Sequence, residues 1–362
     1  MAIDFNLERW ETVKKNVRDW WDGKLGRPLI HMTIGGRSPG RAEPKPSRNI
    51  DKKIFYNLSV TPEEIIDRLD YNLSCYEYLG DSFPSFRPNF GPCVLSLFMG
   101  ARPDPKEDGN VWFHPDKDRE IQDIHLSFNP DNEWLRRIKD ICRVAIDRWG
   151  GLVQVGIPEL AGNLDALSTF RPGEKLLMDL VDFPEEVKRL TWEAHAAWFQ
   201  AFDEINSVLK PVNPGYSAWM GFSDTPYYVL QCDFCYMIGT KMFDEFVKPE
   251  LKASCEKLCR TFYHMDGVGQ LPHLDSLLEI KKLGAVQWIP GAGNGGKPLT
   301  ECWPEVYRKI IKAGKRTEFI GDWRNFDRFI DKIGGGAENF IIGVPADDRR
   351  EAEAFLKRHG AM

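Results

Sequence analysis

The chain has 362 residues, with 48 basic and 54 acidic side chains and a formal net charge of −6. This length is large for one compact domain but ordinary for an α/β barrel, so a single domain over residues 1–362 is predicted. The mildly acidic balance, without long blocks of like charge, argues against binding to nucleic acid or to an anionic membrane.

The first segment, Met1–Trp21, is charged and amphipathic, and it lacks the apolar core and cleavage site of a secretory signal. No stretch approaches the roughly 20 apolar residues that span a bilayer. A cytoplasmic protein is therefore expected. Its eight cysteines are predicted to be thiols. Residues 1–26 are predicted to form an N-terminal helical extension.

Short β-rich runs alternate with longer helical patterns, which is typical of βα units and a parallel sheet. Eight strands with interleaved helices favour a closed (β/α)8 TIM barrel. The polar stretch 102–131 is predicted to be an insertion, and 37–51 a long loop. The predicted strands are Pro28–Ile34, Phe83–Pro88, Leu152–Ile157, Gly215–Met220, Thr261–Met265, Ala285–Ile289, Thr317–Ile320 and Asn339–Val344. The predicted helices include Pro184–Leu209, Met242–Cys259, Leu271–Leu283, Pro304–Ala313 and Arg349–His359.

Active sites of such barrels lie at the carboxyl ends of the strands, so the polar and aromatic residues at those ends are the candidates. Asp233, in the loop after the fourth predicted strand, is a further candidate, although a surface turn is an equal reading. The candidates for substrate binding are Arg37, Asn89, Trp219, Asp233, Gln287, Trp288 and Asp322. The candidates for catalysis are Glu159, His264 and Asp266.

His264 and Asp266 lie two residues apart, so both can face the same side of an extended strand. A histidine and a carboxylate so placed can share a divalent metal or form an acid/base pair. The competing reading is a hydrogen-bonded core histidine followed by a helix-capping aspartate. Glu159 follows a strand as Pro-Glu, which fits either a third metal ligand or a helix start.

The cysteines Cys232, Cys235, Cys255 and Cys259 have a spacing that invites a zinc interpretation. The last pair falls among apolar neighbours in a predicted helix, so buried free thiols are expected instead. The glycine-rich run Gly291–Gly296 lacks the residues of a phosphate-binding loop and is predicted to be a mobile loop that closes over substrate.

Several collinear segments resemble the uroporphyrinogen decarboxylase superfamily, which also contains corrinoid-linked methyltransferases. The resemblance covers roughly residues 25–358 and implies a (β/α)8 barrel. Homodimers occur in that superfamily, so one is expected here. The segments are Phe262–Gly267, Leu271–Leu274, Gly284–Trp288, Leu176–Leu180 with Pro184-Glu185, and Met242–Leu251.

The chain departs from the decarboxylases of this superfamily. Their N-terminal M-R-Q-A-G-R loop corresponds to Met32–Arg37, which keeps only the last arginine. Their essential aspartate would fall at Pro88–Gly91, and their late histidine near Ile342-Gly343, where neither residue type is present. Without the anionic anchor and the arginines, decarboxylation of uroporphyrinogen is not expected.

The corrinoid-linked methyltransferases bind zinc through an H-x-C motif and a later cysteine. Here Asp266 stands in place of the first cysteine, and residues 339–350 contain none. The resemblance implies zinc held by His264, Asp266 and a further ligand such as Glu159 or Asp233. An oxygen-rich site suits an oxygen or nitrogen substrate better than a thiol.

The expected function is therefore demethylation of a small O- or N-methyl compound, with methyl transfer to a corrinoid on a partner protein. One alternative is a metal-independent decarboxylase or lyase for a small carboxylic acid or a porphyrin-like substrate, using Arg37, His264 and Asp266. Another is a barrel that binds a small molecule without catalysis, in which case the mouth would lack titrating groups with perturbed pKa values.

Overall fold

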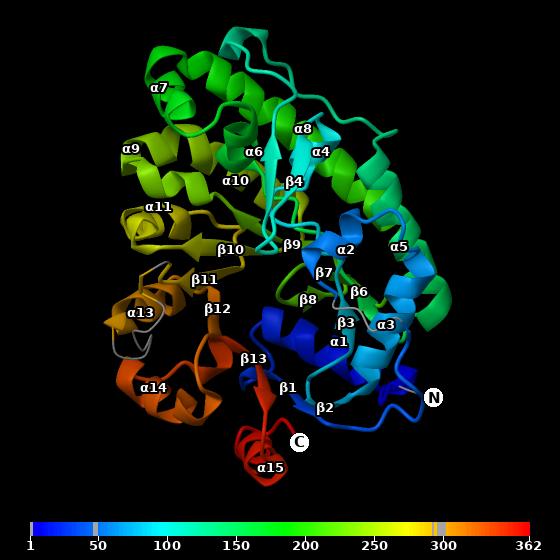
Figure 1. Ribbon diagram of the computed structural model, residues 1–362. Helices are drawn as coiled ribbons and strands as arrows, with labels where there is room; N and C mark the ends of the chain where they lie inside the picture. Colours follow the sequence, from blue (N-terminus) through cyan, green and yellow to red (C-terminus); the bar gives the residue numbers. More distant parts are fainter. Residues whose placement is uncertain (1–2, 46–49, 292, 295–301) are drawn as a thin grey trace.

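A computed structural model describes residues 3–45, 50–291, 293–294 and 302–362. Its centre is a parallel-dominated α/β sheet with helices on its outer faces (Figure 1). The sheet has seven strands in the order β2-β1-β13-β12-β11-β10-β9, and only β2 is antiparallel to its neighbour. These strands are β1 (Leu29–Gly35), β2 (Tyr76–Gly80), β9 (Tyr227–Gln231), β10 (Arg260–Asp266), β11 (Ala285–Ile289), β12 (Arg316–Phe319) and β13 (Phe340–Ala346).

Three two-stranded sheets complete the strand set. They are β3 (Ser85–Phe86) with β6 (Gln154–Val155), β4 (Arg102–Pro105) with β5 (Val111–His114), and β7 (Tyr216–Ser217) with β8 (Phe222–Ser223). The β3–β6 pair is parallel, whereas the other two pairs are antiparallel. Among the described residues no ladder joins β3 to β1 or β6 to β9, so the fold is barrel-like without a closed ring of hydrogen bonds.

The predicted strand Gly215–Met220 is the main error in the strand prediction. Only Tyr216–Ser217 is extended, in a short antiparallel pair with β8. Its place beside β10 is taken by β9, whose five residues are all buried. A strand buried on both faces shows no alternation of apolar and polar residues, and periodicity therefore did not reveal it.

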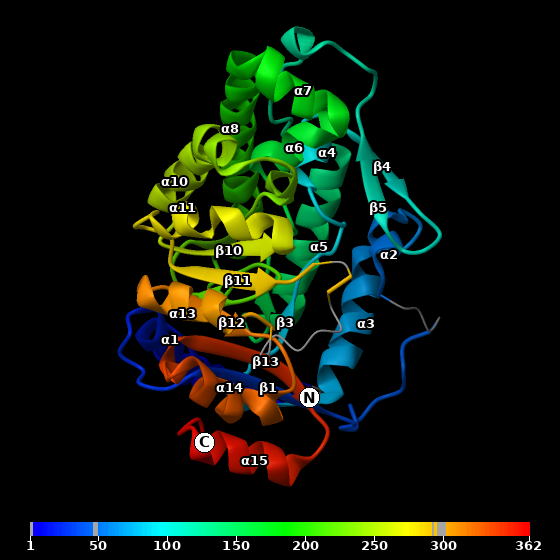
Figure 2. The same ribbon diagram turned by 90° about the vertical axis from the view of Figure 1, so that its left-hand side faces the viewer.

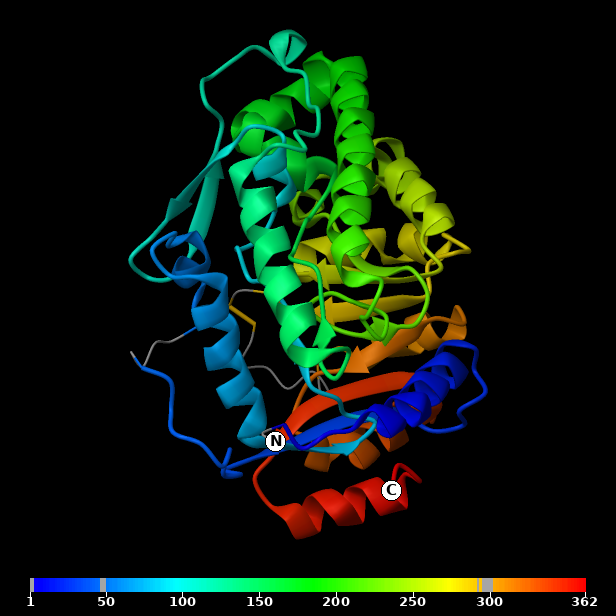
Figure 3. The same cartoon turned by 90° about the vertical axis from the view of Figure 1, so that its right-hand side faces the viewer.

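The helices surround the strands on both sides. Figure 2 shows β10, β11, β12 and β13 in succession, and Figure 3 shows α5 and α8 side by side on the opposite side of the molecule. The α-helices are α1 (Leu7–Trp21), α2 (Lys52–Tyr56), α3 (Pro62–Ser74), α4 (Leu95–Phe98), α5 (Glu133–Trp149), α6 (Asn163–Phe170), α7 (Glu174–Asp182), α8 (Pro184–Leu209), α9 (Thr240–Met242), α10 (Lys248–Lys257), α11 (Leu274–Leu278), α13 (Pro304–Lys312), α14 (Phe326–Ile333) and α15 (Arg349–Arg358). The single-turn elements are η1 (Ile121–Asp123), η2 (Asp233–Met237), η3 (Phe243–Val247, π-helical), η4 (Val268–His273), η5 (Trp323–Asn325) and η6 (Ala337–Asn339).

The predicted helix Pro184–Leu209 is confirmed with the same bounds, starting with proline in its first turn. The predicted helix Met242–Cys259 is divided into α9, the π-helical η3 and α10. Pro249 lies in the first turn of α10 and has no N–H to continue a regular ladder across the junction. None of the described helices is both long and apolar enough to cross a lipid bilayer.

The N-terminal helix α1 belongs to the core. Trp20 stacks on Phe262 with ring centroids 6.3 Å apart, and the Trp21 indole N–H donates to the Phe222 carbonyl at 3.0 Å. Both tryptophans are buried. Since Phe262 lies near the start of β10, α1 covers the amino ends of the strands, opposite the end where an active site is expected.

Candidate functional site

The carboxyl ends of β9, β10 and β11 bring three polar side chains together. In the parallel register, His264 on β10 is paired with Gln231 on β9 and with Gln287 on β11. Paired residues of adjacent strands point to the same face of a sheet. His264 and Gln287 therefore share one face, and Asp266, two residues further along β10, lies toward its end.

A hydrogen-bonded relay fixes the His264 ring. His264 Nδ1 lies 2.5 Å from Gln287 Oε1, and the Gln287 amide nitrogen donates to Glu318 at 2.5 Å. Because the Gln287 oxygen can only accept, Nδ1 carries the proton in this arrangement. The lone pair of a neutral His264 is then on Nε2, which lies 4.0 Å from Asp266 Oδ2. This is the tautomer that a metal-binding histidine requires.

Asp233, His264 and Asp266 form a compact group of possible metal ligands. One donor atom from each lies within 4.8 Å of the other two. Asp266 Oδ1 is buried without a hydrogen-bond partner in the described part of the chain. Gly291 has φ +77°, and a Cβ there would stand 3.3 Å from Asp266 Oδ1. Glycine at 291 thus leaves room beside a carboxylate oxygen that lacks a partner.

Asp233 and the neighbouring Asp165 both have raised pKa values. Asp165 accepts hydrogen bonds from the backbone N–H groups of Asp233 and Phe234, at 2.9 and 2.8 Å. Burial, together with the like charge of Asp233, raises the pKa of Asp165 to about 7. Desolvation by the surrounding walls, followed by repulsion from Asp266 and Glu159, raises the pKa of Asp233 to about 7. A bound cation would relieve this crowding of negative charge.

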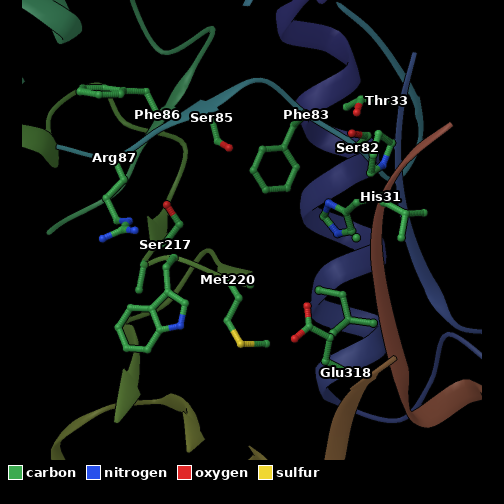
Figure 4. A pocket seen from close by; sticks show the side chains of 17 residues that line it. His31, Thr33, Ser82, Phe83, Ser85, Phe86, Arg87, Ser217, Met220 and Glu318 are labelled. Carbon is green, nitrogen blue, oxygen red and sulfur yellow. The ribbon is translucent and has the colours of Figure 1, made fainter. Parts of the chain in front are cut away.

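A cavity of about 470 Å³ (Figure 4) is connected to this group through two of its lining residues, Trp219 and Glu318. Trp219 lines the cavity and also meets the His264 ring edge to face, with ring centroids 6.0 Å apart. Glu318 lines it as well and is the end of the His264–Gln287–Glu318 relay. Burial raises the pKa of Glu318 to about 7, while its hydrogen bond with Gln287 acts in the opposite direction.

Glu159 and Asp233 were the two alternatives for a further ligand, and the compact group contains Asp233 and not Glu159. The Glu159 carbonyl accepts a hydrogen bond from the Val94 N–H, which ties the turn to the neighbouring chain. Its carboxylate is close enough to influence Asp233 and Arg87 electrostatically. Glu159 therefore lies around the mouth, outside the group of possible ligands.

Four predicted substrate-binding residues are engaged elsewhere. Trp288 alternates with Gln287 along β11, is fully buried, and packs against Trp303 on the helix side. The Arg37 guanidinium donates to the Ser74 carbonyl and pairs with Asp4. In both cases the residue was predicted from its place after a strand, without knowledge of the direction of its side chain.

Asn89 and Asp322 are turn residues. Asn89 accepts a hydrogen bond from the Gly91 N–H, and Asp322 caps η5 by accepting from the Arg324 N–H. Asn89 and Asp322 are absent from the lining of the cavity beside His264. Short polar side chains after strands commonly bond to their own backbone, which explains both positions.

Sequence reasoning missed Arg87, Asp165 and Glu318. Arg87 directly follows β3 and lines the cavity, so its position after a strand was a usable signal. Glu318 lies inside β12, in a segment that was predicted only as a strand and not searched for site residues. Asp165 lies in α6 and gave no signal at all, because its approach to Asp233 depends on the tertiary packing of α6 against η2.

The cysteines do not form a metal group in the described part of the chain. Cys232, Cys235 and Cys255 are buried free thiols, in line with the expectation, whereas Cys259 is exposed because α10 ends before it. Of the predicted glycine-rich loop, positions 292, 295 and 296 lie outside the described residues.

The comparisons with known proteins give a match to fold alone. No protein-family model matches the sequence, and a search of curated proteins gives no match. Among solved structures, the chain is similar to a methyltransferase from Methanosarcina mazei, with a TM-score of 0.60 and 11% sequence identity. The similarity covers 96% of this chain and 98% of that protein, so the whole α/β barrel-like fold is shared.

Proposed function

We propose that this protein is a methyltransferase that demethylates a small O- or N-methyl compound at a divalent metal site formed by Asp233, His264 and Asp266. The observation that carries the proposal is the compact His/Asp/Asp group beside the cavity. The full-length likeness to a methyltransferase supports the reaction class. The chain would then be a divergent member of the uroporphyrinogen decarboxylase and corrinoid-linked methyltransferase superfamily.

The residues fit a divalent cation on three counts. Imidazole nitrogen and carboxylate oxygen are both ligands of zinc, the expected metal. The hydrogen bond of His264 Nδ1 with Gln287 leaves Nε2 available to a metal, and Asp266 Oδ1 has no hydrogen-bond partner among the described residues. Burial, and then repulsion from Asp266 and Glu159, raise the pKa of Asp233, and a bound cation would favour the charged carboxylate against both effects. Small side-chain rotations would close the group around the ion.

Bound zinc would act as a Lewis acid that stabilises negative charge on the heteroatom from which the methyl group departs. Gln287 keeps the His264 tautomer fixed, and the cavity holds the substrate next to Trp219. A cob(I)alamin carried by a partner protein would accept the methyl group. The heteroatom would keep the electron pair of its bond to the methyl carbon and take up a proton.

Two alternatives receive less support. A decarboxylase that uses Arg37 as its carboxylate anchor is disfavoured because the Arg37 side chain contacts Ser74 and Asp4. A barrel that only binds a ligand would be expected to lack titrating groups with perturbed pKa values in its mouth. Asp165, Asp233 and Glu318 all have raised pKa values there.

The test is methyl transfer to free cob(I)alamin, followed by the absorbance of methylcobalamin, with a panel of small methyl ethers and N-methyl compounds. Wild-type protein with zinc is expected to methylate cobalamin with at least one of them, and His264→Gln is expected to lose the activity. Asp322→Asn, which changes an exposed carboxylate away from the cavity, is the matched control and should retain it. Equal rates for wild type and His264→Gln would contradict the proposal.

A further inference from the structure

The cavity beside Trp219 carries a feature that the metal site does not explain. Arg87 lines it, and its Nη1 atom is buried without a hydrogen-bond partner among the described residues. No ion pair within 4.0 Å is formed by Arg87 in the described part of the chain, although Glu159 is close enough to act on its charge. Burial lowers the pKa of Arg87, which nevertheless stays charged, because guanidinium does not deprotonate in proteins.

A charged guanidinium with a buried N–H group that lacks a partner is costly unless something occupies that donor. Arginine presents a planar fork of N–H groups that matches the two oxygens of a carboxylate. Of the described residues that line the cavity, Arg87 is the only fixed cation. Ser85 and Ser217, whose hydroxyls are not hydrogen-bonded elsewhere in the described chain, lie on the same side as Arg87 in Figure 4. They would add donors for the same anion.

The other side of the cavity has a different character. Glu318 lies across from Arg87 in Figure 4, so the one carboxyl group among the described lining residues is on the side away from the guanidinium. Phe83 and Met220 supply apolar surface, and His31 Nε2 is buried without a partner in the described part of the chain. Burial lowers the pKa of His31 to about 4, so this imidazole is neutral at pH 7 and offers a hydrogen bond without a charge.

From these positions we infer that the cavity binds a small organic carboxylate, with the carboxylate on Arg87 and the remainder of the molecule against Phe83, Met220 and Trp219. A volume of about 470 Å³ suits a small molecule. Trp219 contacts His264, so a ligand packed against Trp219 would lie close to the proposed metal. This ligand's role as the methyl donor rests on the proposed function, whereas its binding does not.

The experiment measures binding of propionate and of its neutral counterpart propionamide to the full chain by calorimetry, with and without EDTA. EDTA separates binding at Arg87 from coordination of the carboxylate to a metal. Propionate is expected to bind at least about tenfold more tightly than propionamide, with or without EDTA. Arg87→Gln should remove this preference, and Arg37→Gln, the matched control, should keep it. Arg87→Lys should bind with intermediate affinity because it keeps the charge and loses the fork.

Two results would overturn the inference. One is a preference for propionate that Arg87→Gln leaves unchanged, and the other is the absence of any preference in the wild type. Should Arg87→Gln fail to fold, 15N NMR of the Arg87 guanidinium in the wild-type protein replaces it, and propionate must shift that signal. If methyl transfer fails while Arg87-dependent binding is observed, the proposed function is wrong and the carboxylate site stands. If methyl transfer is observed and propionate binding does not depend on Arg87, only the carboxylate site is refuted.

Discussion

Gln287 holds His264 by a 2.5 Å hydrogen bond to Nδ1 and is itself held by Glu318. The three residues come from β10, β11 and β12, three adjacent strands of the sheet. The tautomer and ring orientation of His264 are therefore set by Gln287 and Glu318, which are not among the proposed metal ligands. Substitutions at these two positions can test whether they support metal binding.

Gln287→Leu is expected to weaken zinc binding by about 10–100-fold, because His264 loses the acceptor that fixes its tautomer and ring orientation. The measurement is a competition titration with a zinc-binding dye. Trp288→Phe, the next residue on the same strand but packed on the helix side, is the control and should bind zinc like the wild type. Unchanged zinc affinity in Gln287→Leu would mean that the hydrogen bond from His264 to Gln287 does not support zinc binding.

Gly269→Ala is expected to disturb the loop that carries Asp233. A Cβ at Gly269 would lie 2.6 Å from Tyr236 Cδ2, so the Tyr236 ring and η2 have to shift. The expected cost is about 1–2 kcal/mol of unfolding free energy, with weaker zinc binding. Gly239→Ala, two residues after η2 and with no atom within 4 Å of the new Cβ, should leave zinc binding unchanged. Equal stability and equal zinc affinity of the two variants would contradict the close approach of position 269 to Tyr236.

The raised pKa of Glu318 predicts that the free energy of unfolding depends on pH. Its pKa rises from 4.5 to about 7 on folding, mainly through burial. Between these values the folded protein keeps a proton that the unfolded chain has lost, so stability falls as the pH rises through the window. Glu318→Gln removes this loss and should gain stability relative to wild type between pH 5 and pH 8, on the order of 2 kcal/mol.

Urea denaturation at several pH values measures this difference. Glu11→Gln, which changes a carboxylate on α1 that is 80% exposed, is the control and should change the unfolding free energy by less than about 0.5 kcal/mol. If the stability difference between Glu318→Gln and wild type does not change with pH, the Glu318 carboxyl is not protonated in the folded protein near neutrality.

Trp20→Ala is expected to destabilise the protein by about 3–5 kcal/mol, because it removes a large side chain that is 1% exposed and stacked on Phe262. Trp112→Ala, at a position 59% exposed on β5, should cost less than about 0.5 kcal/mol. Thermal denaturation of both variants compares them. A small effect of Trp20→Ala would mean that α1 is a detachable extension and not part of the core.

The sequence predicted the elements that carry a strong local signal. Alternation predicted that His264 and Asp266 face the same side at the end of one strand, and Gln287 was a candidate at the end of the next strand; the structure adds that His264 is paired with Gln287 in the parallel register. It could not predict β9, whose residues are buried on both faces and therefore show no period. Position after a strand proved too weak a criterion for Trp288, because it says nothing of which face a side chain takes.

Long-range packing accounts for the remaining differences. Asp165 meets Asp233 across 68 residues of sequence, and Arg18 on α1 pairs with Asp224, a separation of 206 residues. Neither contact has a local signature. The insertion predicted at 102–131 contains the hairpin β4–β5, which its prolines and charged residues concealed.

The central claim is that Asp233, His264 and Asp266 bind one divalent cation, and metal stoichiometry tests it most directly. Protein stripped with a chelator, incubated with zinc and freed of excess metal is analysed by mass spectrometry of the elements. We expect about one zinc per chain in the wild type, with loss in His264→Gln, Asp266→Asn and Asp233→Asn, and retention in Asp275→Asn, an exposed carboxylate on α11. No bound zinc in the wild type, or full occupancy in His264→Gln, would contradict the account.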